Sequence, residues 1–162
     1  MDKPQVGIIM GSKSDKEIMD AAAQILTEFG VDYEMRIVSA HRTPDVMSEY
    51  ANSAKERGLK VIIAGAGGSA HLPGMTASHT SLPVLAVPIK KNPHDHEALW
   101  SNIKMPPGVP LATMPENGAK NAALMAVEIL AVTDSELAGK YLAYRQEMHD
   151  AVIDDDKNIK NP

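Results

Sequence analysis

A histidine and an arginine stand side by side in a short segment of small residues, positions 39–44, with the sequence SAHRTP. The imidazole of His41 can donate and accept a proton near neutral pH. The guanidinium of Arg42 is a permanent cation whose planar donors suit phosphate and carboxylate groups. Together with the preceding Ser39 and Ala40, this pair indicates proton-transfer chemistry on a phosphorylated small molecule.

A second segment, residues 11–15 with the sequence GSKSD, combines hydroxyl groups with a carboxylate after an apolar run. Backbone N–H groups at a helix start, helped by the helix dipole, favour an anion such as phosphate. Ser12 and Ser14 are therefore candidate phosphate contacts, whereas Asp15 suits ribose hydroxyls or helix capping. A plain helix start without a ligand explains this segment alone equally well, and the spacing is not that of a P-loop.

A third segment, residues 65–74, is rich in glycine and reads GAGGSAHLPG. Glycines after a strand permit close approach of the backbone to a flat ligand, but such turns are frequent. The histidine in this segment could equally satisfy a buried backbone group. The candidate contacts are Gly67, Gly68, Ser69, Ala70, His71 and Leu72.

The elements that position these segments alternate between apolar runs and helical patterns. Strands are expected at residues 6–10, 31–38, 60–64 and 82–87, with a weaker one at 109–113, and helices at about 18–29, 46–54 and 119–131. Continuously apolar strands indicate a parallel sheet covered on both faces. We therefore predict an α/β fold, a three-layer doubly wound parallel sheet of about five strands of the flavodoxin-like type.

In such a sheet, ligands bind outside the carboxyl ends of the strands. The three segments follow the first three strands, so they are expected to line one crevice. His41 alone would be best explained as a structural histidine. Its position in this crevice beside Arg42 favours a functional role instead.

The whole chain, residues 1–162, is expected to form a single domain with its core at 5–131. A charged helix is predicted at about 134–153, and residues 154–162 are expected to be a solvated, frayed tail. The apolar positions of this helix recur at helical spacing and require a partner surface. That surface could belong to the same domain or to another subunit.

The composition narrows the function classes. The net charge of −5 disfavours nucleic acid and anionic membranes as main partners, and the absence of cysteine removes thiolate chemistry and fits a cytoplasmic protein. No targeting segment or membrane span is recognised. His94 and His96 flank Asp95, but two histidines without a third ligand are weak support for metal, and none is expected.

The three segments together resemble the PurE family, the class I N5-carboxyaminoimidazole ribonucleotide mutases, also described as the phosphoribosylaminoimidazole carboxylase catalytic subunit. Further similar segments occur at residues 105–110 and 121–124, and the resemblance covers about residues 5–131. It implies a mutase of de novo purine biosynthesis, with His41 as the general acid and base. It also implies a homo-octamer that needs no metal, nucleotide or biotin.

The same resemblance assigns the substrate contacts. Ser12, Ser14 and Arg42 would hold the 5′-phosphate, Asp15 the ribose, and residues 67–72 the aminoimidazole and its carboxylate. The chain departs from the family pattern at residues 90–99 and 113–119, which both follow strands. A class II aminoimidazole ribonucleotide carboxylase and a non-catalytic module that binds a phosphoribosyl ligand are the alternatives.

Overall fold

Five parallel strands form the centre of the structure, a computed structural model that describes residues 3–160. The sheet has the order β2-β1-β3-β4-β5, which confirms the predicted flavodoxin-like arrangement. In chain order the elements are β1 (Val6–Met10), a 3₁₀ turn η1 (Lys13–Asp15), α1 (Lys16–Phe29), β2 (Tyr33–Ile37), α2 (Pro44–Ser53), β3 (Val61–Gly67), α3 (His71–His79), β4 (Val84–Ile89), α4 (Glu97–Ile103), β5 (Ala112–Thr113), α5 (Ala119–Ala131) and α6 (Ser135–Lys160).

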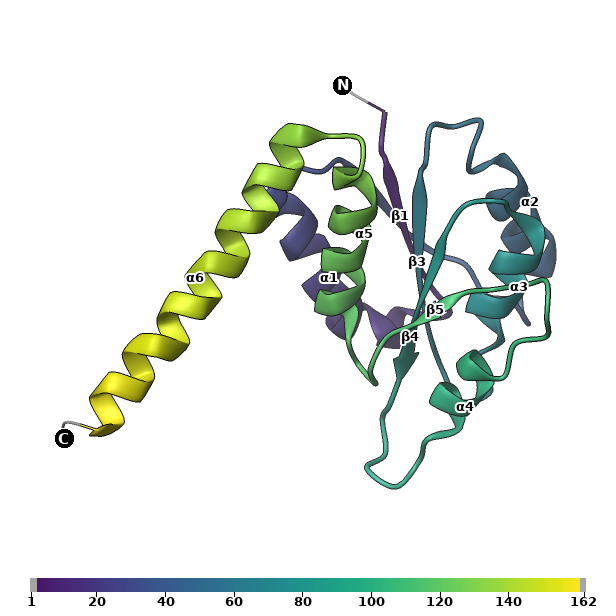
Figure 1. The fold of residues 1–162 in the computed structure, drawn as a ribbon. Coiled ribbons are helices and arrows are strands. Elements are labelled where there is room, and N and C mark those ends of the chain that lie inside the picture. The colour runs from purple at the N-terminus through teal and green to yellow at the C-terminus, as the bar shows by residue number, and fades with distance from the viewer. Residues whose placement is uncertain (1–2, 161–162) are drawn as a thin grey trace.

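Helices cover both faces of the sheet (Figure 1). On one face, α1 and α5 pack over a core that includes Met19, Leu26 and Val127. On the other face, α2, α3 and α4 enclose a second core that includes Met47 and Leu72. Both cores consist mainly of aliphatic residues, alanine and methionine, because the chain contains few aromatic residues. The three layers therefore agree with the prediction.

The third strand is longer than predicted. Gly65 and Gly67, which we expected in a loop, belong to β3. This strand pairs with β1 on one side and with β4 on the other, so its backbone hydrogen bonds outweigh the poor strand propensity of glycine. The missing side chains also leave room for Met19 and Ile89 to pack against the strand. The glycine-rich turn proper begins at Gly68.

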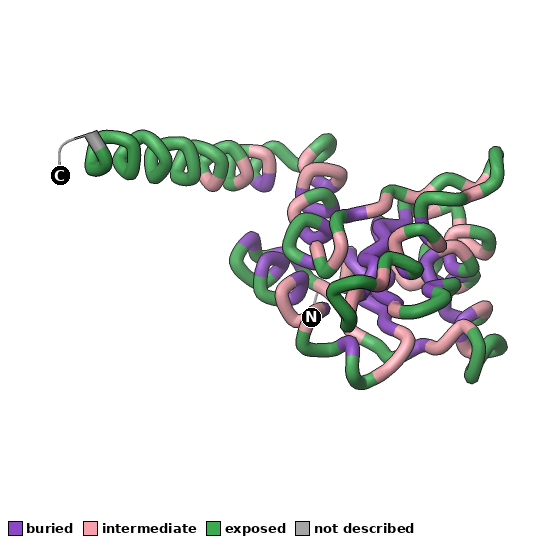
Figure 2. Tube along the Cα trace, turned by 90° about the horizontal axis from the view of Figure 1, so that it is seen from below, coloured by how far each residue is buried: buried purple, intermediate pink, exposed green. Residues whose placement is uncertain are grey.

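The last helix, α6, also extends beyond its prediction. Its first turns pack on the domain, where Phe29 contacts Tyr144 at a ring-centroid distance of 5.5 Å. The remainder projects away from the body and is exposed (Figure 2). The expected frayed tail is wrong for residues 154–160, which are helical, and residues 161–162 lie outside the described part. No glycine or proline interrupts the chain between Gly139 and Pro162, and Lys157 pairs with Asp154 at 2.8 Å.

Two smaller differences concern the second half of the sheet. Strand β4 continues to Ile89, two residues beyond the predicted end, and β5 contains two residues rather than five. The sequence pattern also did not predict α4. The backbone N–H of Glu97 donates to Oδ1 of Asp95 at the start of this helix.

Within residues 3–160, no helix combines the length and the apolar character needed to cross a membrane.

The close packing at Gly65 can be tested by Gly65→Ala. The added methyl group would meet the sulfur of Met19 and would lie 3.2 Å from Cδ1 of Ile89. Since Met19 is fully buried, we expect the free energy of unfolding to fall by about 1–3 kcal/mol. Urea denaturation followed by circular dichroism measures this change.

Gly139→Ala is the matched control, because a methyl group added in α6 meets no atom within 4 Å. Alanine favours a helix over glycine by up to about 1 kcal/mol, so this variant should be as stable as the wild type or slightly more stable. Equal denaturation midpoints for Gly65→Ala and the wild type would contradict the tight packing.

Candidate active site

A pocket of about 450 Å³ opens at the carboxyl edge of the sheet, where the three sequence segments meet. The segments after β1, β2 and β4 contribute to its lining, together with the ends of β3 and β4 and the start of α3. It is lined by Gly11, Ser12, Asp15, Ser39, Ala40, His41, Arg42, Ala66, Gly67, Gly68, Ala70, His71, Leu72, Ile89, Lys91 and Asp95.

Two histidines from different segments meet in this pocket. Nε2 of His41 lies 2.7 Å from Nδ1 of His71, and the rings cross edge to face with centroids 4.8 Å apart. A hydrogen bond at this distance requires one nitrogen to carry a proton and the other to accept it. The two imidazoles therefore constrain each other's tautomers, and both are exposed to an incoming ligand.

Arg42 connects the second segment to the first. Its Nη2 donates to the backbone oxygen of Gly11 at 2.6 Å. Its backbone N–H and its Nε both donate to Oγ of Ser39, at 3.2 and 3.3 Å. These bonds hold the guanidinium over the start of the 3₁₀ turn, beside the hydroxyl-bearing loop. The position suits a planar cation that binds an oxyanion.

The first segment brings two hydroxyl groups and a carboxylate together. Oγ of Ser12 lies 2.6 Å from Oγ of Ser14, which donates to Oδ1 of Asp15 at 3.3 Å. Asp15 is buried, and Lys91 from the loop after β4 reaches its Oδ1 at 2.8 Å. The hydroxyls, one carboxylate and two nearby cations make this end of the pocket suited to a phosphorylated sugar.

The turn after β3 has an unusual backbone. Gly68 has a φ of 59° and Ala70 a φ of 24°, and the latter is a conformation that residues with a side chain rarely adopt. Nδ2 of the buried Asn102 donates to the backbone oxygen of Ala70 at 2.9 Å. This bond from α4 supports the turn after β3. The turn leads directly into α3 and so positions His71, the first residue of that helix.

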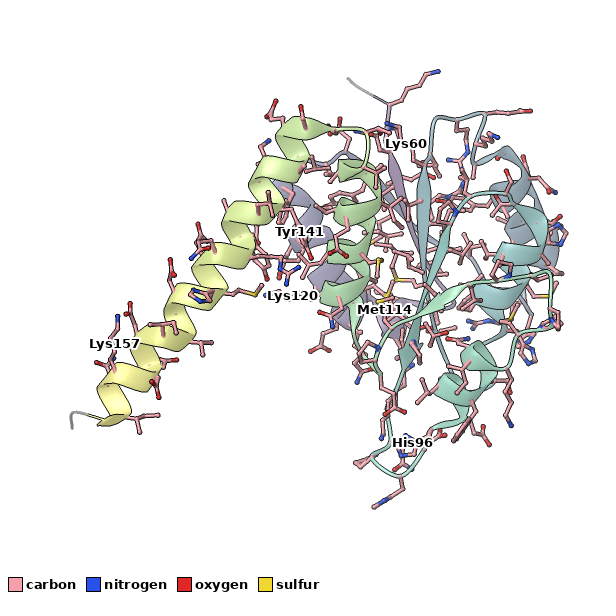
Figure 3. The ribbon with its side chains drawn as sticks, viewed as in Figure 1. Lys60, His96, Met114, Lys120, Tyr141 and Lys157 are labelled. Atoms are coloured by element: carbon pink, nitrogen blue, oxygen red, sulfur yellow. The ribbon has the colours of Figure 1, made fainter. Side chains whose placement is uncertain are left out.

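The loop after β4 is fastened at its base by residues from the β5–α5 connection. The side chain of Asn117 accepts from the N–H of Lys90 at 2.8 Å and donates to its backbone oxygen at 3.1 Å. The carboxylate of Glu116 lies 3.1 Å from Nζ of Lys90 and 2.8 Å from Nδ1 of His96. His96 therefore lies in an ion-pair network at the far end of the molecule from Lys60 (Figure 3).

Within residues 3–160, no group of three or more histidine, aspartate or glutamate side chains is placed to hold a metal ion.

Comparisons with known proteins support the fold and identify the family. The family model described as AIR carboxylase matches residues 5–151. The chain belongs to the AIR carboxylase family. Proteins named N5-carboxyaminoimidazole ribonucleotide mutase from Saccharolobus solfataricus and Thermotoga maritima are each 55% identical to it, over 93% of this chain and 96% and 89% of theirs. A crystal structure of a Treponema denticola PurE2 point variant superposes with a TM-score of 0.90 at 30% identity and covers 99% of this chain and 100% of that one.

Most of the residues selected from the sequence of this AIR carboxylase family member lie around the pocket. Ser14 does not line it but bonds to Ser12 and Lys91. Ser69 faces a neighbouring hollow that also includes Trp100. Sequence reasoning missed five lining residues, and only the departure of residues 90–99 from the family pattern pointed to the last two of them. The five are Gly11, Ala66, Ile89, Lys91 and Asp95.

The ion-pair network at the loop base predicts a pH dependence. Desolvation alone raises the pKa of Glu116, but hydrogen bonds from Lys90 and His96 outweigh it and leave this pKa below its ordinary value. A lowered carboxyl pKa adds stability above the pKa of the unfolded chain, and this is lost as the pH falls through the folded-state pKa. We expect the difference in unfolding free energy between the wild type and Glu116→Gln to be largest above about pH 5 and to shrink toward about pH 3.

Denaturation midpoints across this pH range measure the difference. The exposed Glu56 provides the matched control, because Glu56→Gln removes the same charge from a surface position of the chain. Its difference from the wild type should stay nearly constant with pH. A constant difference for Glu116→Gln would contradict the network.

Proposed function

We propose that the protein is an N5-carboxyaminoimidazole ribonucleotide mutase of de novo purine biosynthesis. It moves a carboxylate from the exocyclic nitrogen of the ribonucleotide to the neighbouring ring carbon, which yields 4-carboxy-5-aminoimidazole ribonucleotide. One observation gives this proposal its main support. The chain is 55% identical to proteins that bear this name, and its His41 lies in a pocket between the loop after β1, which suits an oxyanion, and the glycines at the end of β3.

The substrate would span the pocket from one side to the other. Its 5′-phosphate would bind Ser12, Ser14 and Arg42, and its ribose hydroxyls would bind the buried carboxylate of Asp15. The aminoimidazole and its carboxylate would lie against residues 67–72, with Ser39 and Ala40 beside the ring. The 2.6 Å bond from Arg42 to Gly11 supports this orientation, because it places the cation next to the two hydroxyls.

His41 would act as both general acid and general base. It protonates the carbamate nitrogen, and the bond between that nitrogen and the carboxylate carbon breaks to release carbon dioxide. The ring carbon then attacks the carbon dioxide, and His41 recovers the proton of that carbon. One proton thus leaves His41 and one returns, and the reaction as written needs no metal, nucleotide or biotin. The hydrogen bond to His71 supports this role, because it orients the imidazole.

The free carbon dioxide must stay beside the ring between the two steps. A pocket wall of small residues and backbone dipoles keeps water away from such an intermediate. Gly67, Gly68 and Ala70 provide such a wall here. Binding energy from the remote phosphate holds the ring carbon in place for recarboxylation.

We also propose that the chain is a single-domain subunit of a cytoplasmic homo-octamer, as its family resemblance implies. Exposed apolar side chains along α6 and around α4 support assembly, since such surfaces are normally covered. They include Trp100, Ile103, Leu142, Val152, Ile153 and Ile159.

Two substrate mixtures test the proposed reaction. The purified protein should turn over N5-carboxyaminoimidazole ribonucleotide without bicarbonate, and it should be slow with aminoimidazole ribonucleotide plus bicarbonate. Formation of the 4-carboxy product is followed by absorbance. Fast turnover with the second mixture alone would instead identify a carboxylase that uses carbon dioxide directly.

The role of His41 predicts a specific effect of His41→Asn. Asparagine cannot transfer the proton, so turnover should fall by about 10²–10⁴-fold, the usual contribution of general acid–base catalysis. Affinity for the 4-carboxy product, measured by calorimetry, should change little. His94→Asn is the matched control at an exposed histidine that does not line the pocket. Unchanged turnover in His41→Asn would refute the assignment.

A further inference from the structure

Lys91 is the one cation that reaches into the pocket from the loop where this chain departs from the family pattern. Its Nζ lies 2.8 Å from Oδ1 of Asp15 and donates to Oγ of Ser14 at 2.7 Å. The Asp15 side chain is only 5% exposed, whereas that of Lys91 is 56% exposed. The charged end of the lysine thus lies on the hydroxyl loop at the pocket, while more than half of its side chain is exposed.

The start of this side chain is held in place. Asn117 bonds both the N–H and the backbone oxygen of Lys90, and Glu116 binds the Lys90 ammonium. Three polar contacts therefore hold Lys90, the residue before Lys91. A lysine on such a base can move its ammonium over a short range while its backbone stays in position.

We propose that Lys91 is a second cation for the 5′-phosphate of the ligand, a specificity determinant that rests on the proposed function. The Ser14 hydroxyl is a proposed phosphate contact, and the Lys91 ammonium already bonds to that hydroxyl. A phosphate oxygen that binds Ser14 is therefore a neighbour of the ammonium. Lys91 would exchange part of its contact with Asp15 for the phosphate when the ligand binds.

The charges at this end of the pocket support the same role. A phosphate monoester carries about −1.5 to −2 charges at pH 7, and it would arrive beside the buried carboxylate of Asp15. Arg42 supplies a single positive charge, and Asp95 is a second carboxylate in the pocket lining, so without Lys91 the site would hold a large negative excess. The lysine reduces that excess and offsets the repulsion between Asp15 and phosphate.

Calorimetric affinities for a matched pair of ligands test this role. The pair is 4-carboxy-5-aminoimidazole ribonucleotide and its dephosphorylated nucleoside, measured on the wild type, Lys91→Met, Lys91→Arg and Arg42→Ala. In Lys91→Met we expect about tenfold weaker binding of the nucleotide, a modest loss because the ion pair is partly exposed. Nucleoside binding should change by less than about twofold, and Lys91→Arg should restore most of the nucleotide affinity.

Kinetics give an independent measurement in the same variants. For Lys91→Met the loss should fall on KM far more than on kcat, because phosphate contacts act on binding. Lys60→Met is the control for net charge, since Lys60 lies at the opposite end of the molecule from His96 of the loop after β4 (Figure 3), does not line the pocket and bonds to Gln5. It should match the wild type for both ligands.

Three outcomes would overturn the proposal or its basis. Equal losses for nucleotide and nucleoside in Lys91→Met would mean that Lys91 acts only on Asp15. No loss for either ligand would mean that it does not contact the ligand at all. If Arg42→Ala also leaves nucleotide affinity unchanged, the proposed phosphate end itself is wrong, and this result separates that failure from the failure of Lys91 alone.

Discussion

The site depends on the parallel alignment of β1 and β3 at the centre of the sheet. Because these strands are neighbours and point the same way, the segments that follow them leave from the same edge, and β2 adds a third segment beside them. Gly65 allows this alignment at full packing density, because Met19 and Ile89 occupy the space of its missing side chain. A bulkier residue at position 65 would disturb β3, the strand that ends at the pocket.

The pocket combines cations and carboxylates in a protein that is acidic as a whole. Its lining contains Arg42 and Lys91 together with Asp15 and Asp95. The chain carries a net charge of −5, yet Arg42 and Lys91 both face the hydroxyl loop. The overall charge disfavours polyanions such as nucleic acids, whereas the two cations beside the hydroxyl loop offer a local contact for the phosphate of the proposed ligand. The carboxylate of Asp15 opposes the approach of phosphate, and its burial fixes the position of a group that would contact the sugar in the proposed complex.

The local sequence pattern predicted the fold class and most of the residues around the pocket. It could not predict contacts between segments that are distant in the sequence. The segments with Ser12, His41 and His71 follow the first three strands, and the rule for parallel sheets places them together. The contact of Lys91 with Asp15 depends on a loop conformation set by Glu116 and Asn117, which no local pattern encodes. Likewise, the glycines of β3 form a strand because of pairing with two neighbours, which outweighs propensity.

The exposure of the two histidines connects the proposed chemistry to the proposed assembly. His41 and His71 are exposed in the single chain, yet carbon dioxide can be held only where water is kept out. In the proposed complex the glycines of the pocket lining would shield one side of the aminoimidazole ring, and the remaining cover would come from the ligand and from neighbouring copies of the proposed assembly. Trp100 of α4 lies exposed at a hollow that also includes His71, and Ile103 is exposed at the end of the same helix. An assembly that buries them would therefore both stabilise the subunits and enclose the reaction.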